Sequence, residues 1–359
     1  MKQPALIGVL RTKLMSAFKK ESAMNKIMLI TVLILCVVIG GYAQNITKVG
    51  TTAGQFLKVD IGPRAIGMGG AFVATADDIT GLYWNPAGIA RNYSAEAVFN
   101  HVNWFADINL DYAAASVYIN GLGSLGAFVN VLSMDDMTVR TVEMPEGTGE
   151  IFTYSGLALG LSYARELTDN FSIGFNVKYV RESIWNSTAQ GFAIDVGTLY
   201  RIPILNEFRL ASSISNFGSK MRLEGRDLRS TLVVGSIDGN LVNTDVTLDS
   251  YDLPLMFRVG IATDVLKADD MRLTVGVDAI HPNDHTEYLN TGVECAWNEM
   301  LFIRGGYKAL FESEGEQQYT LGAGINYDLG GVMKVRIDYA YEKFGRLKDV
   351  QYLSLGVKF

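Results

Sequence analysis

The chain has 359 residues, of which 48% are hydrophobic and 19% charged, with 37 glycines, 17 tyrosines, 17 phenylalanines and only 7 prolines. Its formal net charge of −7 disfavours nucleic-acid binding, because phosphate contacts need a basic surface. A soluble chain of this length would normally form two or three domains, but turn signals recur along its whole length, which favours one sandwich or barrel of many short strands.

Residues 1–43 are predicted to be an export signal. A basic flank that ends at Lys26 is followed by an apolar run of thirteen residues, 27–39, and by small residues that suit cleavage before Gln44. The run is shorter than the roughly 20 residues that a membrane-spanning helix needs. The true translation start is expected at Met24.

Loss of this signal would remove six basic residues and one acidic residue. The remaining part carries 25 basic and 37 acidic side chains, a formal net charge of −12. Cys295 is then the one cysteine left, and one cysteine cannot form an internal disulfide. The fold must therefore be stable without such a bond.

Residues 44–92 are predicted to form a periplasmic lead-in followed by a hatch inside a barrel. The segment Gly62–Ala90, GPRAIGMGGAFVATADDITGLYWNPAGIA, is rich in glycine and in turn-forming Asp and Asn-Pro. Its large apolar residues need a surface to bury against, which strands further along the chain would supply. These residues are Ile66, Met68, Phe72, Val73, Leu82 and Trp84.

One basic residue, Arg64, lies within this segment. Because burying a charge alone is costly, a basic residue in a plug must be paired. We expect its partner to be a carboxylate on the lumen side of the barrel. The candidates are Asp278, Asp338 and Asp195.

The hatch segment also carries a family resemblance. The run GPRAIGMGGAFVATADD followed by YWNPAGIA resembles the N-terminal hatch of FadL-like outer-membrane proteins, and within that superfamily the PorV/PorQ family. The resemblance implies a 14-stranded barrel in the outer membrane. The residues that match the hatch motif are Arg64, Gly67, Gly69, Gly70, Asp77, Asp78, Trp84, Asn85, Pro86 and Ala87.

Residues 93–359 are predicted to form the barrel, because apolar residues alternate there with polar or small ones. Successive side chains of a strand point to opposite faces, so each segment has one apolar and one polar face. The runs are longer than the roughly 5–6 residues of a globular strand and suit tilted membrane strands of about 9–11 residues. A membrane barrel turns the apolar face toward lipid and the polar face toward the lumen. The predicted fold is therefore all-β, a 14-stranded antiparallel transmembrane barrel with an N-terminal hatch.

The fourteen strands are predicted near 95–104, 110–119, 123–135, 153–166, 170–184, 189–201, 207–216, 254–265, 271–281, 286–297, 300–310, 318–328, 332–343 and 350–359. Short connections follow the even-numbered strands. The two long connections, 136–152 and 217–253, both follow odd-numbered strands, as outer loops do. The strand-like stretch 232–237 is assigned to the larger outer loop.

The last strand alternates apolar residues and ends in phenylalanine. This pattern resembles the signal that barrel-assembly machinery reads on outer-membrane proteins. The residues that carry it are Leu353, Leu355, Val357 and Phe359.

Motifs of enzymes are not found in the sequence. Gly67-Met68-Gly69 lacks the third glycine of a dinucleotide loop, and no GxSxG elbow is present. His281 and His285 could bind a metal, but residues four apart on a strand do not share a face as they do on a helix. His101 is expected to be a polar lumen residue. We predict a protein that is not an enzyme and has no metal or cofactor.

The family resemblance implies a role in protein secretion. PorV-like members capture cargo with a C-terminal signal as it leaves a large translocon of the type IX secretion system. The expected partners are thus outer-membrane lipid, the barrel-assembly machinery, a translocon and secreted cargo. The alternative is FadL-like transport of hydrophobic small molecules such as long-chain fatty acids, and a third possibility is a surface protein with a permanently closed lumen.

Overall fold

The computed structural model describes residues 49–359 except 204–205, 235–239 and 313–315. The predicted export signal, residues 1–43, and the first residues of the lead-in lie outside the described residues. Within that range, fourteen long strands form a closed antiparallel barrel in which the first strand pairs with the last. None of the helices in this part of the chain has the length and apolarity to cross a membrane.

The barrel strands are β1 Glu96–Asn103, β2 Ile108–Ile119, β3 Gly123–Met134, β6 Tyr154–Thr168, β7 Phe171–Ile184, β8 Ser187–Ile202, β9 Phe208–Gly218, β13 Met256–Lys267, β14 Met271–Pro282, β15 Tyr288–Trp297, β16 Leu301–Leu310, β17 Gln317–Leu329, β18 Met333–Phe344 and β19 Val350–Lys358. Every strand pairs with its neighbours along the chain. The predicted number of strands is confirmed, and the predicted boundaries differ from these by two residues at most.

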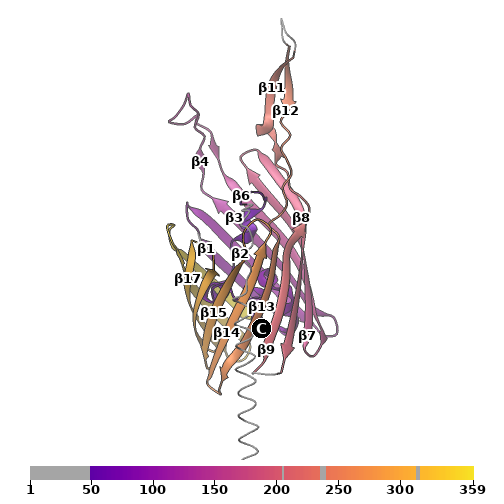
Figure 1. The fold of residues 1–359 in the computed structure, drawn as a ribbon, viewed down its shortest axis with the longest axis vertical. Helices are drawn as coiled ribbons and strands as arrows, with labels where there is room; N and C mark the ends of the chain where they lie inside the picture. The colour runs from indigo at the N-terminus through magenta and orange to yellow at the C-terminus, as the bar shows by residue number, and fades with distance from the viewer. Residues whose placement is uncertain (1–48, 204–205, 235–239, 313–315) are drawn as a thin grey trace, which may run out of the picture. The chain divides into compact units, whose positions relative to one another are not determined.

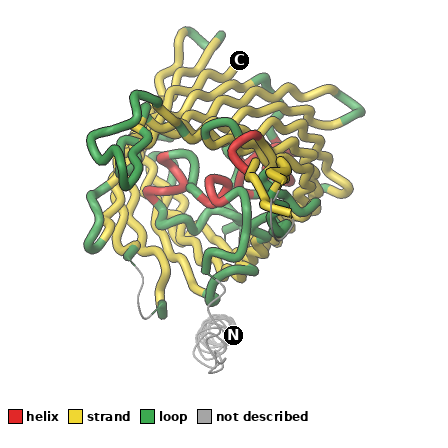
Figure 2. Tube along the Cα trace, turned by 90° about the horizontal axis from the view of Figure 1, so that it is seen from above, coloured by secondary structure: helices red, strands yellow, loops and turns green. Residues whose placement is uncertain are grey.

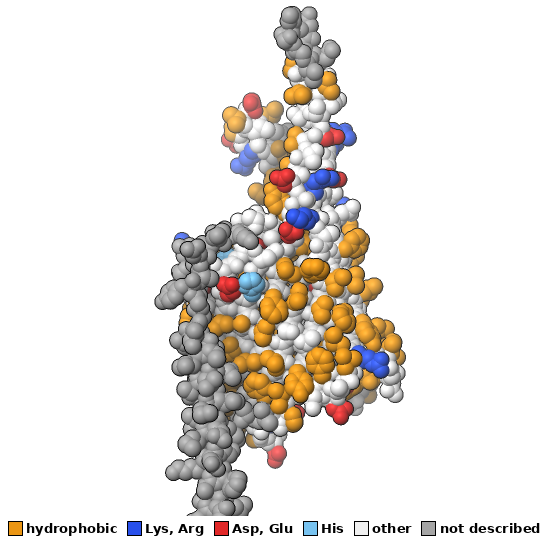
Figure 3. Space-filling view, turned by 45° about the vertical axis from the view of Figure 1, so that its right-hand side comes forward, with side chains coloured by type: hydrophobic (Ala, Val, Ile, Leu, Met, Phe, Trp, Pro, Cys, Tyr) orange, Lys and Arg blue, Asp and Glu red, His pale blue; other side chains and the backbone are white. Residues whose placement is uncertain are grey.

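Apolar side chains cover the outer wall of the barrel (Figure 3). Along β6 and β7, Leu161 is 71% exposed and Val177 is 56% exposed, whereas the neighbouring Ser162 and Asn176 are buried in the lumen. The pleat of the strands places these two sets on opposite faces. The barrel thus has the apolar-out, polar-in pattern of a transmembrane barrel.

The two long connections leave the same end of the barrel, at the top of Figure 1. The first contains β4 Met137–Thr138 and β5 Ile151–Phe152. The second contains β10 Glu224–Gly225, η3 Arg226–Leu228, β11 Arg229–Val234 and β12 Asn240–Asp245. Because β11 and β12 pair only with each other, the strand-like stretch near 232 belongs to the outer loop, as predicted. Long loops mark the outer face of such barrels.

The hatch fills the lumen inside the ring of strands (Figure 2). Its short helices are η1 Gln55–Lys58, α2 Pro63–Gly67, α3 Gly81–Trp84 and η2 Pro86–Arg91. Large apolar side chains of this segment are fully buried. They include Ile61, Ile66, Met68, Phe72, Leu82 and Ile89.

The described part of the lead-in lies at the outer-loop end, so its predicted periplasmic position is wrong. The Thr52 hydroxyl donates to Asp284 at 2.8 Å, and Lys58 Nζ lies 2.9 Å from the same carboxylate. The Ala53 amide donates to the Asp252 carbonyl at 2.9 Å. Asp252 and Asp284 both belong to connections on the long-loop side. A turn-rich segment carries no pattern that shows from which end it enters a lumen, which explains the error.

A charge on the outer wall tests the orientation of the strands. Leu161 lies in the middle of β6, and we expect Leu161→Arg to destabilise the barrel in a bilayer by about 2–4 kcal/mol, because the guanidinium would face hydrocarbon. Denaturant titration of the protein refolded into vesicles measures this loss. Val142→Arg, at a loop residue that is 95% exposed, is the control and should have little effect. Equal effects of the two substitutions would contradict the orientation.

Candidate functional site: the contact between hatch and barrel

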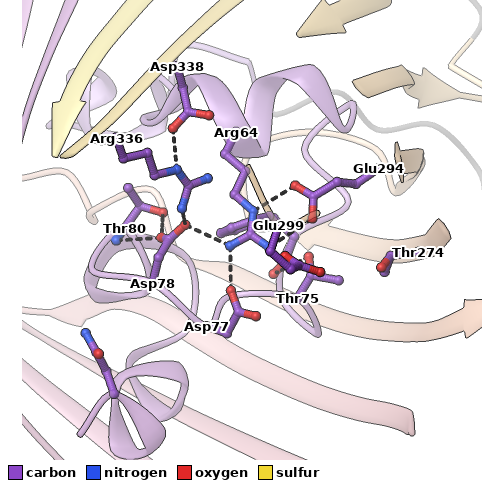
Figure 4. A network of polar contacts seen from close by, with 12 residues as sticks. Arg64, Thr75, Asp77, Asp78, Thr80, Thr274, Glu294, Glu299, Arg336 and Asp338 are labelled. Carbon is purple, nitrogen blue, oxygen red and sulfur yellow. Dashed lines mark hydrogen bonds and ion pairs between the residues drawn. The ribbon is translucent and has the colours of Figure 1, made fainter. Parts of the chain in front are cut away.

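A closed ring of ion pairs joins the hatch to the barrel wall, and Figure 4 shows the part of it that runs from Glu294 through Arg64, Asp78 and Arg336 to Asp338. It consists of six side chains of alternating charge, which we call the charge ring: Arg64, Glu294, Arg304, Asp338, Arg336 and Asp78. The hatch supplies two of the six, and strands β15, β16 and β18 supply the other four. With three positive and three negative members, the ring is electrically balanced.

On the hatch side of the ring, Arg64 bridges two carboxylates. Its Nε lies 3.0 Å from Glu294 Oε2, and its Nη1 lies 2.9 Å from Asp78 Oδ2. Arg336 Nη1 lies 3.1 Å from the same Asp78 oxygen. Asp77 extends the ring with a contact of 2.5 Å to Arg64 Nη1.

On the barrel side, the two remaining members close the ring. Arg304 Nε lies 2.7 Å from Glu294 Oε2, and Arg304 Nη1 lies 2.7 Å from Asp338 Oδ1. Arg336 Nε lies 2.6 Å from Asp338 Oδ2. Glu294 and Arg304 are almost completely buried. Removing one member of such a buried pair leaves an uncompensated charge and typically costs about 3–5 kcal/mol.

The predicted partners of Arg64 were wrong in detail. Its contacts are Asp77, Asp78 and Glu294. Asp338 is a member of the ring but contacts Arg304 and not Arg64. The other two candidates hold different parts of the lumen. Asp278 accepts the Phe72 and Val73 amides of the hatch at 2.7 and 2.8 Å, and Asp195 pairs with Lys178 at 2.7 Å.

Electrostatics favour the ionised form of Asp78. Burial alone raises the pKa of its carboxyl, but the guanidinium groups of Arg336 and Arg64 outweigh burial and lower the pKa to about 2. The Thr80 hydroxyl, which donates to Asp78 Oδ1, lowers this pKa as well. Asp78 is therefore ionised at neutral pH.

A second ion cluster lies on the same half of the barrel. Lys308 Nζ lies 2.7 Å from Asp60 of the hatch and 2.7 Å from Glu342 of β18. The Tyr352 hydroxyl donates to the other oxygen of Glu342 at 2.6 Å. Hatch and barrel are thus joined by charge at two separate places.

The Asn85-Pro86-Ala87 triplet packs against two paired glycines. The Asn85 amide donates to the carbonyls of Val73 and Thr198 at 3.0 and 3.1 Å, and its Oδ1 accepts the Ala87 amide at 3.1 Å. Gly174 and Gly197 face each other on β7 and β8. A Cβ at Gly174 would lie 2.3 Å from the Pro86 carbonyl carbon, and one at Gly197 would lie 2.0 Å from Asn85 Oδ1.

The hatch glycines use a similar arrangement on the opposite wall. Gly69 has a φ of +66° and lies against the backbone of Tyr307. Gly292 and Gly306 are paired there on β15 and β16. A Cβ at Gly306 would lie 2.1 Å from the Gly69 nitrogen. Glycine on both sides lets hatch and barrel backbones touch.

The remaining motif residues are also buried against the wall. Gly67 packs against Gly322, and Gly70 packs against the Asn290 side chain. The Trp84 indole donates to the Ile61 carbonyl at 2.8 Å, and the Arg258 guanidinium lies 5.4 Å from its ring centre. The motif therefore forms one contact surface with the barrel.

The structure corrects the position expected for His101 and gives His281 and His285 separate partners. Val102 is buried in the lumen, so its neighbour His101 faces outward and contacts Asp111 at 2.7 Å, which corrects its predicted lumen position. His281 pairs with Glu287 and His285 with Glu312. No group of three metal-ligating side chains occurs among the described residues.

The C-terminal pattern faces lipid. Leu353, Leu355 and Phe359 are between 52 and 63% exposed on the outer wall. The Phe359 amide donates to the Ala95 carbonyl at 2.9 Å, next to the pairing of β1 with β19. A role of this segment in recognition by assembly machinery stays a prediction.

Several important residues were not singled out from the sequence. Glu294, Arg304 and Arg336 form half of the charge ring. A signal for them exists, because each is a charged residue at an inward position of a predicted strand. Glycines inside strand patterns, such as Gly174 and Gly197, likewise indicate a close backbone approach.

Breaking the ring should loosen the hatch. We expect Glu294→Gln to raise the leak of small solutes through liposomes several-fold, because Arg64, Arg304 and Arg272 would lose a shared carboxylate, a change worth about 3–5 kcal/mol. Glu299→Gln is the control, since the Glu299 side chain is 61% exposed and its ion pair is with Arg272, which is not a member of the ring. A leak equal in both variants would count against the ring.

Acid should loosen the hatch in a defined pH window. The pKa of Asp78 is about 2 in the folded protein and about 3.9 in an unfolded chain. Its stabilisation is therefore complete above about pH 4 and is lost as the pH falls toward 2. Protonation of Asp78 should make the conductance across planar bilayers rise as the pH falls below 4. Asp78→Asn should abolish much of this dependence, and an unaltered acid response would refute the assignment.

The barrel has the fold of known hydrocarbon channels. The toluene transporter TodX of Pseudomonas putida matches with a TM-score of 0.55 and 14% identity, over 83% of this chain and 97% of that chain. A structure described as the CymD monoaromatic hydrocarbon channel matches with a TM-score of 0.54 and 13% identity, over 84% of this chain and 97% of that one. At such low identity, the likeness shows the fold alone.

A search of curated protein sequences gives no match. The family described as type IX secretion system protein PorV matches residues 42–281, which is more than half of the chain and includes the hatch and the barrel from β1 to most of β14. Together with the closed barrel and its apolar outer wall, this match makes the protein an outer-membrane barrel. The chain belongs to the PorV family.

Proposed function

We propose that the protein serves protein secretion, and that its outer loops hold secreted cargo or a translocon partner while the hatch keeps the lumen closed. The membership of the PorV family carries this proposal. Export by the predicted signal, residues 1–43, and the absence of enzymatic activity are part of it. Outer-membrane lipid and the barrel-assembly machinery are the further expected partners.

The outer loops offer a surface for such partners. The ribbon β11–β12 extends beyond the barrel at the long-loop end (Figure 1). Its cross-strand pairs Leu232–Val242 and Val233–Leu241 are apolar, and these four side chains are 43–72% exposed. Exposed apolar side chains on a projecting ribbon are typical of a contact surface for another protein.

The contacts that hold the hatch favour a lumen that stays closed while cargo is bound at the outer loops. It is held by two ion clusters and by backbone contacts with paired glycines. Cargo held on the outer loops would not need these contacts to break.

Transport of a hydrophobic small molecule is the second candidate. A pocket of about 230 Å³ lies at the outer-loop end and is lined mostly by apolar side chains. These include Tyr154, Ile184, Met221, Leu223 and Tyr251. Such a pocket could hold a small apolar ligand, as the names of TodX and CymD suggest for those proteins.

Affinity purification from the native outer membrane in mild detergent tests the secretion role. We expect the tagged barrel to recover a very large outer-membrane protein and secreted cargo. Replacing 229–245 by a short Gly-Ser linker should lower that recovery about ten-fold, because the apolar ribbon would be lost. A linker of the same composition replacing 139–148 is the control for loop shortening.

Each variant must first show normal heat-modifiable migration, which reports a folded barrel. Recovery of the barrel alone with bound lipid or fatty acid would refute the secretion role and favour hydrophobic transport. Unchanged recovery by the 229–245 variant would refute the ribbon as the contact surface while leaving the family role intact.

A further inference from the structure

Two arginines face each other across strands β8 and β9 near the short-turn end of the barrel. Arg201 and Arg209 are direct cross-strand partners, and Arg209 is only 7% exposed. Residues in such positions on antiparallel strands have Cβ atoms about 4.5–5.5 Å apart, and like charges placed there destabilise the pairing. The arginine pair therefore requires negative charge close by.

An apolar cluster lies next to this pair on the side of the outer face. Two residues further along the strands are Leu199 and Ala211, which also face each other. They belong to an apolar cluster with Ala262 of β13 and with Val73 and Ala74 of the hatch. Because every second side chain of a strand points to the same face, the two arginines point into the lumen as well. They lie between this cluster and the short turn that joins β8 to β9.

The carboxylates of the barrel wall compensate the arginine pair only in part. Arg209 Nη2 lies 2.6 Å from Asp264 Oδ1, but Arg209 Nε is buried without a hydrogen-bond partner among the described residues. Arg201 Nε is also buried without a partner there, and Arg201 forms no ion pair within the described part of the chain. Counted together with Asp264, the two arginines carry one positive charge in excess.

Two further carboxylates act on the charge of Arg201 but are engaged elsewhere. They are Asp77 of the hatch and Glu207 of the turn between β8 and β9. Asp77 contacts Arg64 at 2.5 Å, and Glu207 lies 3.8 Å from Lys267. Neither carboxylate supplies the hydrogen-bond acceptor that Arg201 Nε lacks.

The arginine pair is accessible from the periplasmic side. Arg201 is partly exposed, and because the apolar cluster covers the pair toward the outer face, its exposed part faces the short-turn end. A wide vestibule of about 630 Å³ lies at that end and is lined in part by Asp77, whose charge acts on both arginines. A solute that enters the vestibule therefore comes close to the pair.

We propose that Arg201 and Arg209 bind a phosphate group at the periplasmic mouth of the lumen. Arginine binds phosphate through paired, charge-assisted hydrogen bonds. A phosphate group has more acceptor oxygens than a carboxylate, so it can serve both Nε atoms at once, and its charge offsets the excess positive charge of the pair. Inorganic phosphate and the headgroup of an inner-leaflet phospholipid both carry this group. The site is independent of the proposed role in secretion.

Titration with inorganic phosphate tests the site. We expect the purified barrel in detergent micelles to broaden the phosphorus NMR signal of phosphate in a saturable way, and Arg201→Gln to weaken this binding about five-fold or more. Because Arg201 pairs with no described carboxylate, this variant leaves no partner unpaired and should fold, which heat-modifiable migration verifies. Arg165→Gln is the matched control and should bind phosphate normally, since Arg165 is exposed on the outer wall of β6 at the same end of the barrel.

Native mass spectrometry of the same three proteins with added phosphatidylglycerol identifies the source of the phosphate. A loss of retained lipid in Arg201→Gln but not in Arg165→Gln would support the site and assign the lipid headgroup to it. Weaker binding of inorganic phosphate without a loss of lipid would support the site and assign free phosphate. The proposal would be overturned if Arg201→Gln lowered neither quantity, or if Arg165→Gln lowered them equally.

Discussion

The burial of Arg64 inside the lumen is the constraint on which the hatch depends. An isolated guanidinium there would lose its hydration without compensation. The structure meets this requirement with a closed ring in which every charge touches two of the opposite sign. Because members are shared, the loss of one carboxylate affects two arginines at once. The position of the hatch and the register of β15, β16 and β18 are therefore coupled through the same six side chains.

Charge alone would not bring the hatch so close to the wall. Paired glycines on β7–β8 and on β15–β16 leave room for the hatch backbone, and at these places any side chain would collide with it. The ion pairs and the paired glycines hold the hatch on the β7–β8 and β13–β18 sides of the lumen. On the β1–β3 side, the buried inward residues are a mixture of polar and apolar side chains, such as Asn100, Tyr112, Ala114 and Phe128. The lumen is thus asymmetric, with the ion pairs and glycine contacts that hold the hatch concentrated on these two parts of the wall.

Much of this fold could be predicted from local sequence patterns. Period-two alternation gave all fourteen strands, because each strand of a membrane barrel has one lipid-facing and one lumen-facing side. The identity of the partners of Arg64 was not accessible in this way. Glu294 lies 230 residues further along the chain, and only the register of the closed barrel places it opposite the hatch. The direction in which residues 52–58 enter the lumen, and the outward position of His101, depend on the same tertiary information.

The coupling between hatch and wall also bears on the choice between the two proposed functions. A solute that crosses the lumen on the β15–β18 side must separate Arg64 from Glu294 and Asp78 from Arg336, and breaking buried pairs of this kind costs about 3–5 kcal/mol each. An apolar solute would offer no charge in exchange, so it could not recover that cost. A partner bound at the outer loops would leave the ring untouched.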